Sequence, residues 1–369
     1  MIWNNGVMNV PDALTRLITR QLDQSGGWLG FDRFMALALY APGLGYYSGP
    51  RRKLGWMPES GSDFVTAPEL SPWFGRALAR SVAQALQVTD SREVWEFGAG
   101  SGVLALQMLG ALGQAVDTYH IVELSGSLRE RQQQTLAALA PRVVWHDALP
   151  EQMSGVVVGN ELLDAMPVQL LFRQGGDWHE RGVVASGDAQ RPWAWSDRPT
   201  ALRPPTEIEG SHDYLTEIHP QAEAFVRTLA QRLTRGAVFW IDYGFPEREY
   251  YHPQRHMGTL MCHQGHRSDP DPLADVGAKD ITAHVNFTGI AVAAQQAGLE
   301  VLGYTSQARF LINNGLVNLL EQASVAERAM AQKLLTEHEM GELFKVIALG
   351  AGPAWDPLGF AQGDRTHTL

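Results

Sequence analysis

The sequence predicts an α/β protein built on a Rossmann-like, doubly wound and mostly parallel sheet of seven strands, with helices on both faces. Two observations predict this fold. Short apolar runs rich in β-branched and aromatic residues recur between about residue 91 and residue 353. Longer segments with apolar residues at helical spacing separate them. Strands that alternate with helices in this way pair in parallel, because each helix carries the chain back to the same end of the sheet.

Each element follows from its local pattern. Residues 1–90 are predicted as an N-terminal helical region, since apolar residues recur at helical spacing over 11–24 and 31–40. The seven predicted strands cover residues 93–97, 118–123, 142–146, 154–159, 236–244, 299–306 and 343–350. The helices predicted between them cover residues 101–112, 126–139, 220–234 and 287–298.

Two insertions interrupt the main domain, which is predicted over 91–353. They lie at about 170–211, a stretch rich in Trp, Pro and Gly, and at about 245–283. Insertions of this length after strand ends commonly build substrate surfaces. Residues 354–369 have no apolar period and are expected to form a loose C-terminal tail.

Composition excludes several classes of protein. The net charge of −11 over 369 residues argues against nucleic-acid binding, which requires a basic face. Cys262 is the single cysteine, so no intrachain disulfide can form. No apolar run approaches the ~18 residues that a membrane span requires. The N-terminus has no apolar signal core, so a cytoplasmic location is expected, while the oligomeric state stays open.

A glycine-rich loop follows the first predicted strand. In EFGAGSG, Gly98, Gly100 and Gly102 stand between that strand and its helix, with Glu96 two residues before them. Glycine permits a left-handed backbone and lets a ligand approach the main chain closely. Such a loop is weak evidence by itself. Because no Gly-Lys-Ser/Thr follows, it is not a phosphate-binding loop of the nucleoside-triphosphatase type.

Acidic residues near this loop favour one ligand class. Glu123 ends the second strand, where a carboxylate can accept hydrogen bonds from both ribose hydroxyls of an adenosine. Asp147 follows the third strand, where it can reach an adenine amino group. NAD and S-adenosylmethionine both offer a ribose, but an acidic rim suits the cationic S-adenosylmethionine better. The alternative is that Glu96 and Asp147 are loop carboxylates without a ligand.

These motifs resemble those of a known family. EFGAGSG, VELS, GNELLDAMP, WIDYG and DITAHVNF occur in the order typical of class I S-adenosylmethionine-dependent methyltransferases, and more narrowly of the MidA-like family. GSDFVTAPEL and TLMCHQGHR strengthen the resemblance, which covers about residues 30–350. The chain differs from the family pattern at Met261 and Asn286.

The resemblance implies more than the cofactor. The mitochondrial members are protein arginine methyltransferases required for assembly of respiratory complex I. It therefore implies S-adenosylmethionine as cofactor and a protein substrate, with a respiratory-complex subunit as the expected partner. It also implies that the N-terminal region covers the cofactor and substrate, with Thr66 and Glu69 over the cofactor.

The stretch VVVGNELLDAMP is the strongest candidate for the acceptor site. It ends the fourth strand, at the edge of the sheet where ligands bind in doubly wound folds. Glu161 and Asp164 are predicted to lie on one face of a helical turn and to bind an acceptor guanidinium, with Asn160 near the cofactor. The structural alternative is a turn capped by Asp164. Asp242 and Tyr243 end the next strand and are weaker candidates for the same site.

His284 is a candidate acceptor of the released proton, because histidine titrates near neutral pH. The alternative is a histidine hydrogen-bonded to a nearby backbone group. A cluster of His and Cys residues over 252–266 matches no standard zinc spacing, so no metal is expected.

Three functions remain open beside protein arginine methylation. The chain could transfer methyl groups to another nucleophile. It could bind the cofactor without turnover, as a chaperone-like assembly factor. An NAD-dependent oxidoreductase is the most distant alternative.

Overall fold

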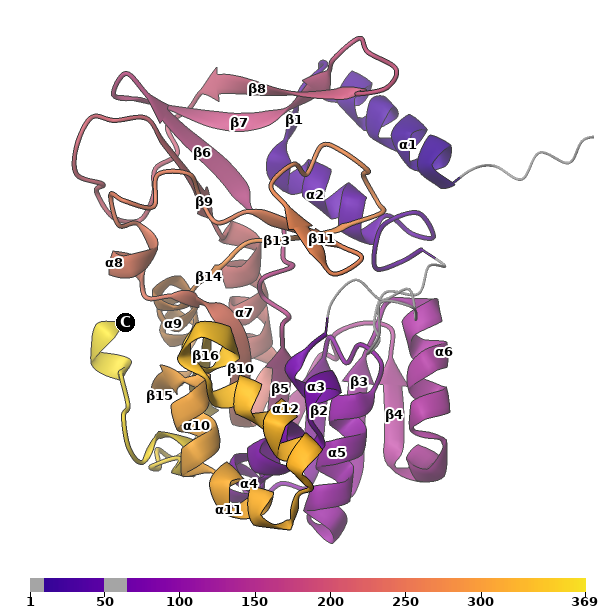
Figure 1. Cartoon of the computed structure of the whole chain (residues 1–369), viewed down its shortest axis with the longest axis vertical. Coiled ribbons are helices and arrows are strands. Elements are labelled where there is room, and N and C mark those ends of the chain that lie inside the picture. The colour runs from indigo at the N-terminus through magenta and orange to yellow at the C-terminus, as the bar shows by residue number, and fades with distance from the viewer. Residues whose placement is uncertain (1–9, 50–64) are drawn as a thin grey trace, which may run out of the picture.

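The computed structural model describes residues 10–49 and 65–369 (Figure 1). Its central sheet has the strand order β15-β16-β10-β5-β2-β3-β4, and a two-residue strand, β14, pairs with the end of β10. The bounds are β2 Glu93–Phe97, β3 Thr118–Val122, β4 Val143–His146, β5 Met153–Asn160, β10 Leu233–Phe245, β14 Val285–Asn286, β15 Glu300–Ser306 and β16 Phe344–Ala351.

The sheet is mixed, with eight strands in place of the seven predicted. Neighbouring strands from β4 to β10 pair in parallel, as expected. Strand β16 runs antiparallel to both β10 and β15. An apolar pattern does not report strand direction, because a strand buried on both faces reads the same either way. The pattern also missed β14, which is too short to show a period.

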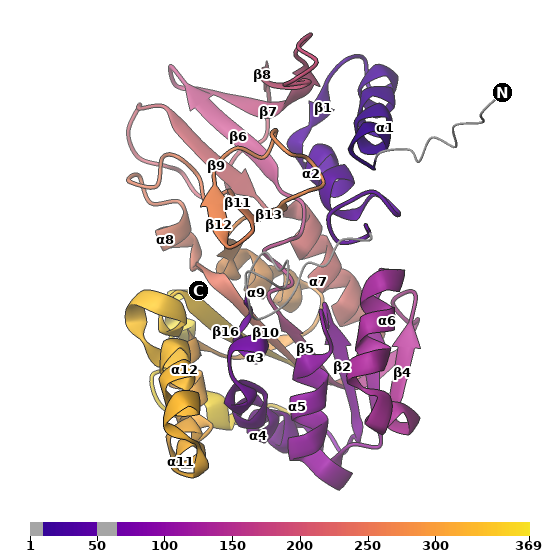
Figure 2. The same ribbon diagram turned by 45° about the vertical axis from the view of Figure 1, so that its right-hand side comes forward.

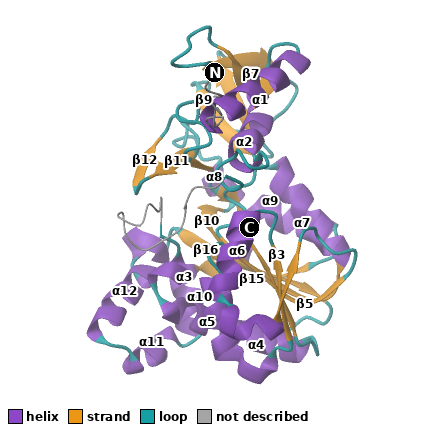
Figure 3. Ribbon diagram, turned by 90° about the vertical axis from the view of Figure 1, so that its right-hand side faces the viewer, coloured by secondary structure: helices purple, strands orange, loops and turns teal. Residues whose placement is uncertain are grey.

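Helices cover both faces of this sheet, so the doubly wound arrangement is confirmed (Figure 3). Within β5, Val156 and Val158 join one apolar core while Val157 joins the other. This alternation follows from the two-residue period of a strand. The helices are α3 Ala67–Leu70, α4 Pro72–Val88, α5 Val103–Leu112, α6 Gly126–Thr135, α7 Pro220–Arg232, α9 Phe287–Gln296, α10 Gln307–Asn313, α11 Leu316–Leu319 and α12 Val325–Leu335. Short helical turns are η2 Gly113–Ala115, η3 Ala137–Arg142, η4 Leu320–Gln322 and η5 Glu337–Gly341.

A second, antiparallel sheet lies above the first in Figure 1. Its strands are β1 Leu29–Gly30, β6 Gln169–Gln174, β7 Asp177–Ala185, β8 Trp193–Pro199 and β9 Tyr214–Ile218. Helices α1 (Val10–Gln24) and α2 (Phe31–Tyr40) share an apolar core with it. The described part of the N-terminal region is therefore divided, because α3 and α4 pack on the central sheet instead.

The range 245–283 forms a small third sheet. Helix α8 (Glu247–Tyr250) precedes strands β11 (Met261–Gln264), β12 (Arg267–Asp269) and β13 (Asp280–Thr282). Figures 1 and 2 both place this sheet between the antiparallel sheet and the central one. No helix in the described ranges is long and apolar enough to cross a membrane.

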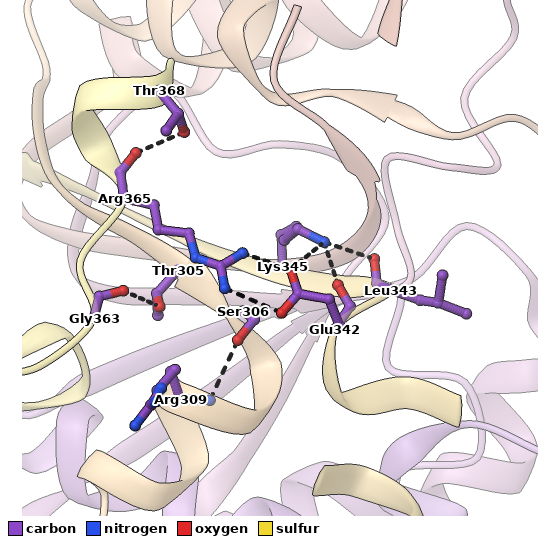
Figure 4. Close-up of polar contacts among 9 residues, drawn as sticks. All are labelled: Thr305, Ser306, Arg309, Glu342, Leu343, Lys345, Gly363, Arg365 and Thr368. Atoms are coloured by element: carbon purple, nitrogen blue, oxygen red, sulfur yellow. Dashed lines mark hydrogen bonds and ion pairs between the residues drawn. The ribbon is translucent and has the colours of Figure 1, made fainter. Parts of the chain in front are cut away.

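The expectation of a loose C-terminal tail was wrong, because residues 354–369 pack on the rest of the fold. It contains the helical turns η6 (Leu358–Phe360) and η7 (Thr366–Thr368). Phe360 is buried against Phe310, with ring centroids 5.5 Å apart. Further along, the Thr305 hydroxyl donates to the Gly363 carbonyl at 2.7 Å, and Arg365 pairs with Glu342 (Figure 4). One buried aromatic side chain and a few polar contacts therefore fix this segment, although its sequence has no periodic pattern of apolar residues.

Candidate active site

A cavity of about 1100 Å³ opens at the carboxyl ends of the parallel strands. The glycine loop and the ends of β3, β5 and β10 form its floor. The other lining residues come mainly from α2 and the turn after it, from residues 65–69, from the segment 255–284 and from residues 343–344. The cavity thus lies where doubly wound sheets bind their ligands, beyond the carboxyl edge of the strands.

The glycine loop has the backbone that its sequence predicts. Gly98, Gly100 and Gly102 have φ angles of 67°, 53° and 82°, in the left-handed region that favours glycine. A Cβ atom on Gly98 would lie 3.2 Å from Leu162, so the loop also packs closely against the turn after β5. Glu96 lies beneath the loop, and burial raises the pKa of its carboxyl to about 7.

Glu123 presents a fixed carboxylate at the end of β3. Its Oε1 accepts a hydrogen bond from the Ser125 N–H at 2.8 Å, and its Oε2 accepts one from Gln132 Nε2 at 2.9 Å. Burial raises the pKa of this carboxyl. These bonds hold a hydrogen-bond acceptor at the cavity wall, where the hydroxyls of a bound ribose can reach it.

Of three other residues predicted to contact the cofactor, two line the cavity and one does not. Thr66 and Glu69 line the cavity, and the Ser101 hydroxyl donates to Glu69. Asp147 is not brought to the cavity, since its side chain is 86% exposed and pairs with Arg129. The motif residues 61–64 lie outside the described ranges.

The turn after β5 is not the helical turn that we expected, nor does Asp164 cap it. Glu161 has φ of 52°, a left-handed conformation that is uncommon outside glycine. The N–H groups of Leu162, Leu163 and Asp164 all donate to Oδ2 of Asp242, at 3.1, 2.8 and 3.2 Å. Strand register explains this, because β10 pairs with β5 up to the residue before Asp242 and so places its carboxylate under the turn.

The turn nevertheless brings Glu161 and Asp164 to the same cavity. Burial, with a smaller contribution from the neighbouring Asp164 carboxyl, raises the pKa of Glu161 to about 8. Burial also raises the pKa of Asp164, although a hydrogen bond from the Tyr243 hydroxyl opposes the shift. Within residues 10–49 and 65–369, no ion pair joins either carboxyl to a cation.

Buried polar atoms without a hydrogen-bond partner indicate that the cavity binds a polar or cationic ligand. Oδ1 of Asn160, Oδ1 of Asp164 and Nδ1 of His284 are buried without a hydrogen-bond partner in the described structure. All three residues line the cavity. Buried acceptors of this kind are costly unless a ligand satisfies them. S-adenosylmethionine carries an ammonium group and a sulfonium cation, so these residues fit the expected cofactor.

His284 is a weaker base than its residue type suggested. Burial, with smaller contributions from Arg255 and Lys345, lowers the pKa of its ring to about 4. Its backbone N–H donates to the Thr259 hydroxyl at 3.0 Å, and its ring lies 5.3 Å from that of Tyr243. The ring is therefore neutral at physiological pH and can accept a hydrogen bond, but it is poorly suited to hold a proton.

Sequence reasoning missed a group contributed from outside the central sheet. The Tyr47 hydroxyl donates to Asp280 at 2.8 Å, and Tyr47 stacks on Tyr40 at 5.5 Å. All three residues line the cavity. Asp280 begins the DITAHVNF motif, which was the one available signal. The two tyrosines lie in or beside a Gly/Pro-rich loop. Such a loop has no regular period, so its sequence does not predict where a side chain points.

The described part of the chain contains no group of three or more His, Cys, Asp or Glu residues that could hold a metal ion. Cys262, in the middle of the His/Cys stretch, is buried in the core shared by α1 and α2.

Comparison with known proteins points to the same cofactor. Residues 77–305 match the family described as "Putative S-adenosyl-L-methionine-dependent methyltransferase". A Burkholderia thailandensis protein, solved with S-adenosyl-homocysteine bound, is 48% identical, with a TM-score of 0.91 and full coverage of both chains. S-adenosyl-homocysteine is what remains of S-adenosylmethionine after methyl transfer.

More distant relatives carry a named activity. The chain is 26% identical to the mitochondrial protein arginine methyltransferase NDUFAF7 of Danio rerio, covering 88% of this chain and 83% of the relative. It is 27% identical to the protein of the same name from Homo sapiens, covering 88% and 81%.

Proposed function

The chain belongs to this family of S-adenosylmethionine-dependent methyltransferases, and from that premise we propose that it methylates an arginine side chain of a partner protein. S-adenosylmethionine is the cofactor. Two lines of support favour arginine as the acceptor. The mitochondrial relatives are named protein arginine methyltransferases, and the cavity has the charge that a guanidinium requires.

One observation carries the proposal: three carboxyl groups without a counter-charge in the described structure lie at or beneath the turn after β5. Asp164 and Asp242 are buried and Glu161 beside them is half-buried, and among the described residues none of the three forms an ion pair with a cation. Burial without a counter-charge is unfavourable, and it raises the pKa of all three carboxyls. A guanidinium would relieve this cost, because it offers a planar fork of donors that matches carboxylate oxygens.

The bound cofactor supplies an electrophilic methyl group, and the protein's own residues must prepare the acceptor. A guanidinium is protonated at neutral pH and is a poor nucleophile. Glu161 and Asp164 would hold it in one orientation and draw its positive charge toward the carboxylates. A carboxyl whose pKa is raised to about 8, as at Glu161, is also a suitable acceptor for the proton that leaves.

We assign the cofactor side of the cavity to the glycine loop and its neighbours. Glu123 would accept hydrogen bonds from the ribose, and Asn160 Oδ1 would face the amino-acid end. Glu96, Gly98, Gly100 and Gly102 shape the loop around the cofactor, with Thr66 and Glu69 on the opposite wall. Asp147 could join them only if its side chain left Arg129.

The partner follows from the sequence resemblance. We propose a subunit of a respiratory complex as the protein substrate, as the mitochondrial members of the family suggest. The experiment that tests the function does not presuppose it. A lysate from cells that lack this protein is incubated with tritiated S-adenosylmethionine and the purified chain, and labelled proteins are separated on a gel.

We expect at least one labelled band, and we expect it to be absent with a Glu123→Ala variant, which should lose the ribose contact and with it cofactor binding. No labelled band with protein shown to be loaded with cofactor would contradict the proposal and favour an assembly factor without turnover.

A further inference from the structure

Exposed apolar side chains gather around the mouth of the cavity. Twelve large apolar side chains are well exposed in the described structure, and five of them line this cavity. These five are Tyr40, Leu124, Met257, Met261 and Leu343. Single exposed apolar residues are normal on a protein surface, but a group of them around one opening indicates a binding surface.

Met257 is 77% exposed on a loop whose backbone is fixed from within. The Glu217 carboxylate, fully buried on β9, accepts hydrogen bonds from the N–H groups of Thr259 and Leu260 at 2.7 and 3.0 Å. The Tyr250 hydroxyl donates to the same carboxylate at 2.9 Å. The loop is therefore held in one position, and its apolar tip is presented to solvent without a partner in the described chain.

Leu343 is 48% exposed on a second fixed segment, just before β16. The Lys345 ammonium donates to the Leu343 carbonyl at 3.5 Å, and Arg365 pairs with Glu342 (Figure 4). In Figure 4 the Leu343 side chain points away from this polar cluster. The C-terminal segment thus helps to hold an apolar residue at the cavity mouth. Pre-organised contacts of this kind reduce the entropy cost of binding.

The floor of the cavity is acidic, because Glu161 and Asp164 line it and neither forms an ion pair with a cation in the described structure. A ligand that reaches from floor to mouth must therefore carry a cation at one point and an apolar group at another. A volume of about 1100 Å³ corresponds to a compact space about 10 Å across. An extended chain covers that distance in about three residues, at ~3.3 Å each.

We propose that the mouth binds an extended segment of the protein substrate in which a large aliphatic side chain lies within three residues of the acceptor arginine. Met257 and Leu343 contact that aliphatic side chain while Glu161 and Asp164 hold the guanidinium. The proposal rests on the proposed function and gives its substrate a sequence preference. A membrane surface is a poorer fit, because anionic lipids attract basic surfaces and this chain has a net charge of −11.

The test uses short synthetic peptides with one central arginine among Ser, Gly and Ala. In each peptide one position, from three before to three after the arginine, is changed to Leu. Methyl transfer from tritiated S-adenosylmethionine gives KM for the full chain and for Met257→Gln and Leu343→Gln. Both positions are exposed, so folding should be preserved. Val325→Gln is the matched control, because Val325 is 84% exposed and does not line the cavity.

We expect Leu at one or more positions to lower KM about three- to tenfold relative to the all-polar peptide, as burial of part of a leucine side chain would produce. Met257→Gln and Leu343→Gln should each remove most of that gain without changing the Kd for S-adenosylmethionine. Val325→Gln should retain it. Equal KM values for polar and Leu-containing peptides, or equal effects of all three variants, would overturn the inference while leaving arginine methylation intact. Failure to methylate any arginine peptide, by protein that binds the cofactor normally, would contradict the proposed function itself.

Discussion

Asp242 determines the shape of the turn after β5, where we propose that the acceptor binds. It is 1% exposed, and burial followed by its neighbours Asp164 and Glu161 raises its pKa well above the usual range. One of its oxygens accepts three consecutive N–H groups, which keeps the turn after β5 out of helical geometry. Glu161 is left in a left-handed conformation with its carboxyl in the cavity. Strain and crowded acids of this kind persist where function needs them.

Replacing Glu161 by Gln should weaken the proposed acceptor clamp. The side chain keeps its size but loses the charge that a guanidinium requires. We expect kcat/KM for an arginine peptide to fall about 10- to 100-fold, the equivalent of one charge-assisted hydrogen bond. The Kd for S-adenosylmethionine, measured by calorimetry, should change less than twofold.

Glu337→Gln, an exposed change outside the cavity, is the matched control. Unchanged turnover in Glu161→Gln would remove this residue from the acceptor site.

The pH dependence of kcat/KM should reflect the ionisation of Glu161. Free protein holds Glu161 with a pKa of about 8, so the carboxyl is protonated and unable to pair with a cation below that pH. Arginine stays charged throughout, hence kcat/KM should rise with pH and level off above about 8. Glu161→Gln should lack the rise near pH 8. A wild-type profile that is flat between pH 6 and 9 would show that Glu161 does not have to ionise.

At the scale of whole elements, local patterns predicted the floor of the cavity. Three glycines between a strand and a helix mark the loop on the cavity floor, and Glu123 follows directly after the next strand. These features depend on a few consecutive residues. They were visible in the sequence because strand ends in a doubly wound sheet all meet at one edge.

The walls of the cavity could not be predicted in this way. Tyr47 reaches Asp280 across 233 residues of chain, and Asp242 holds a turn about 80 residues before it. No periodicity encodes such pairs, because they depend on how separate elements pack. The exposed position of Asp147 and the antiparallel direction of β16 could not be predicted for the same reason.

The C-terminal segment offers a direct test of packing. Phe360 lies against Phe310 and fills the space over Gly303, where even a Cβ atom would come within 2.3 Å of its ring. Phe360→Ala should lower the free energy of unfolding in urea by about 3 kcal/mol, the usual cost of removing a buried phenyl ring. Gln362→Ala, exposed in the same segment, should cost less than 0.5 kcal/mol. Equal small effects of both changes would mean that the segment is loose after all.

At the scale of the whole molecule, the cavity joins parts with separate cores. The central sheet supplies the glycine loop and the acids of the turn after β5. Residues 255–284 and helix α2, which share a core with the antiparallel sheet, supply another part of the wall. In the proposed function the central sheet thus supplies both the cofactor side and the acidic turn that holds the acceptor, while the added elements complete the cavity around them, as is common where one fold hosts many substrates.

The central claim is that the methyl group arrives on arginine. Tandem mass spectrometry of the protein labelled in the lysate tests it most directly, because the fragments locate the added 14 mass units of a methyl group on one side chain. We predict that the group lies on the guanidino nitrogens of an arginine, and that Glu161→Gln lowers its yield. A methyl group found on a lysine, a carboxylate or a hydroxyl, with arginine unmodified, would contradict it.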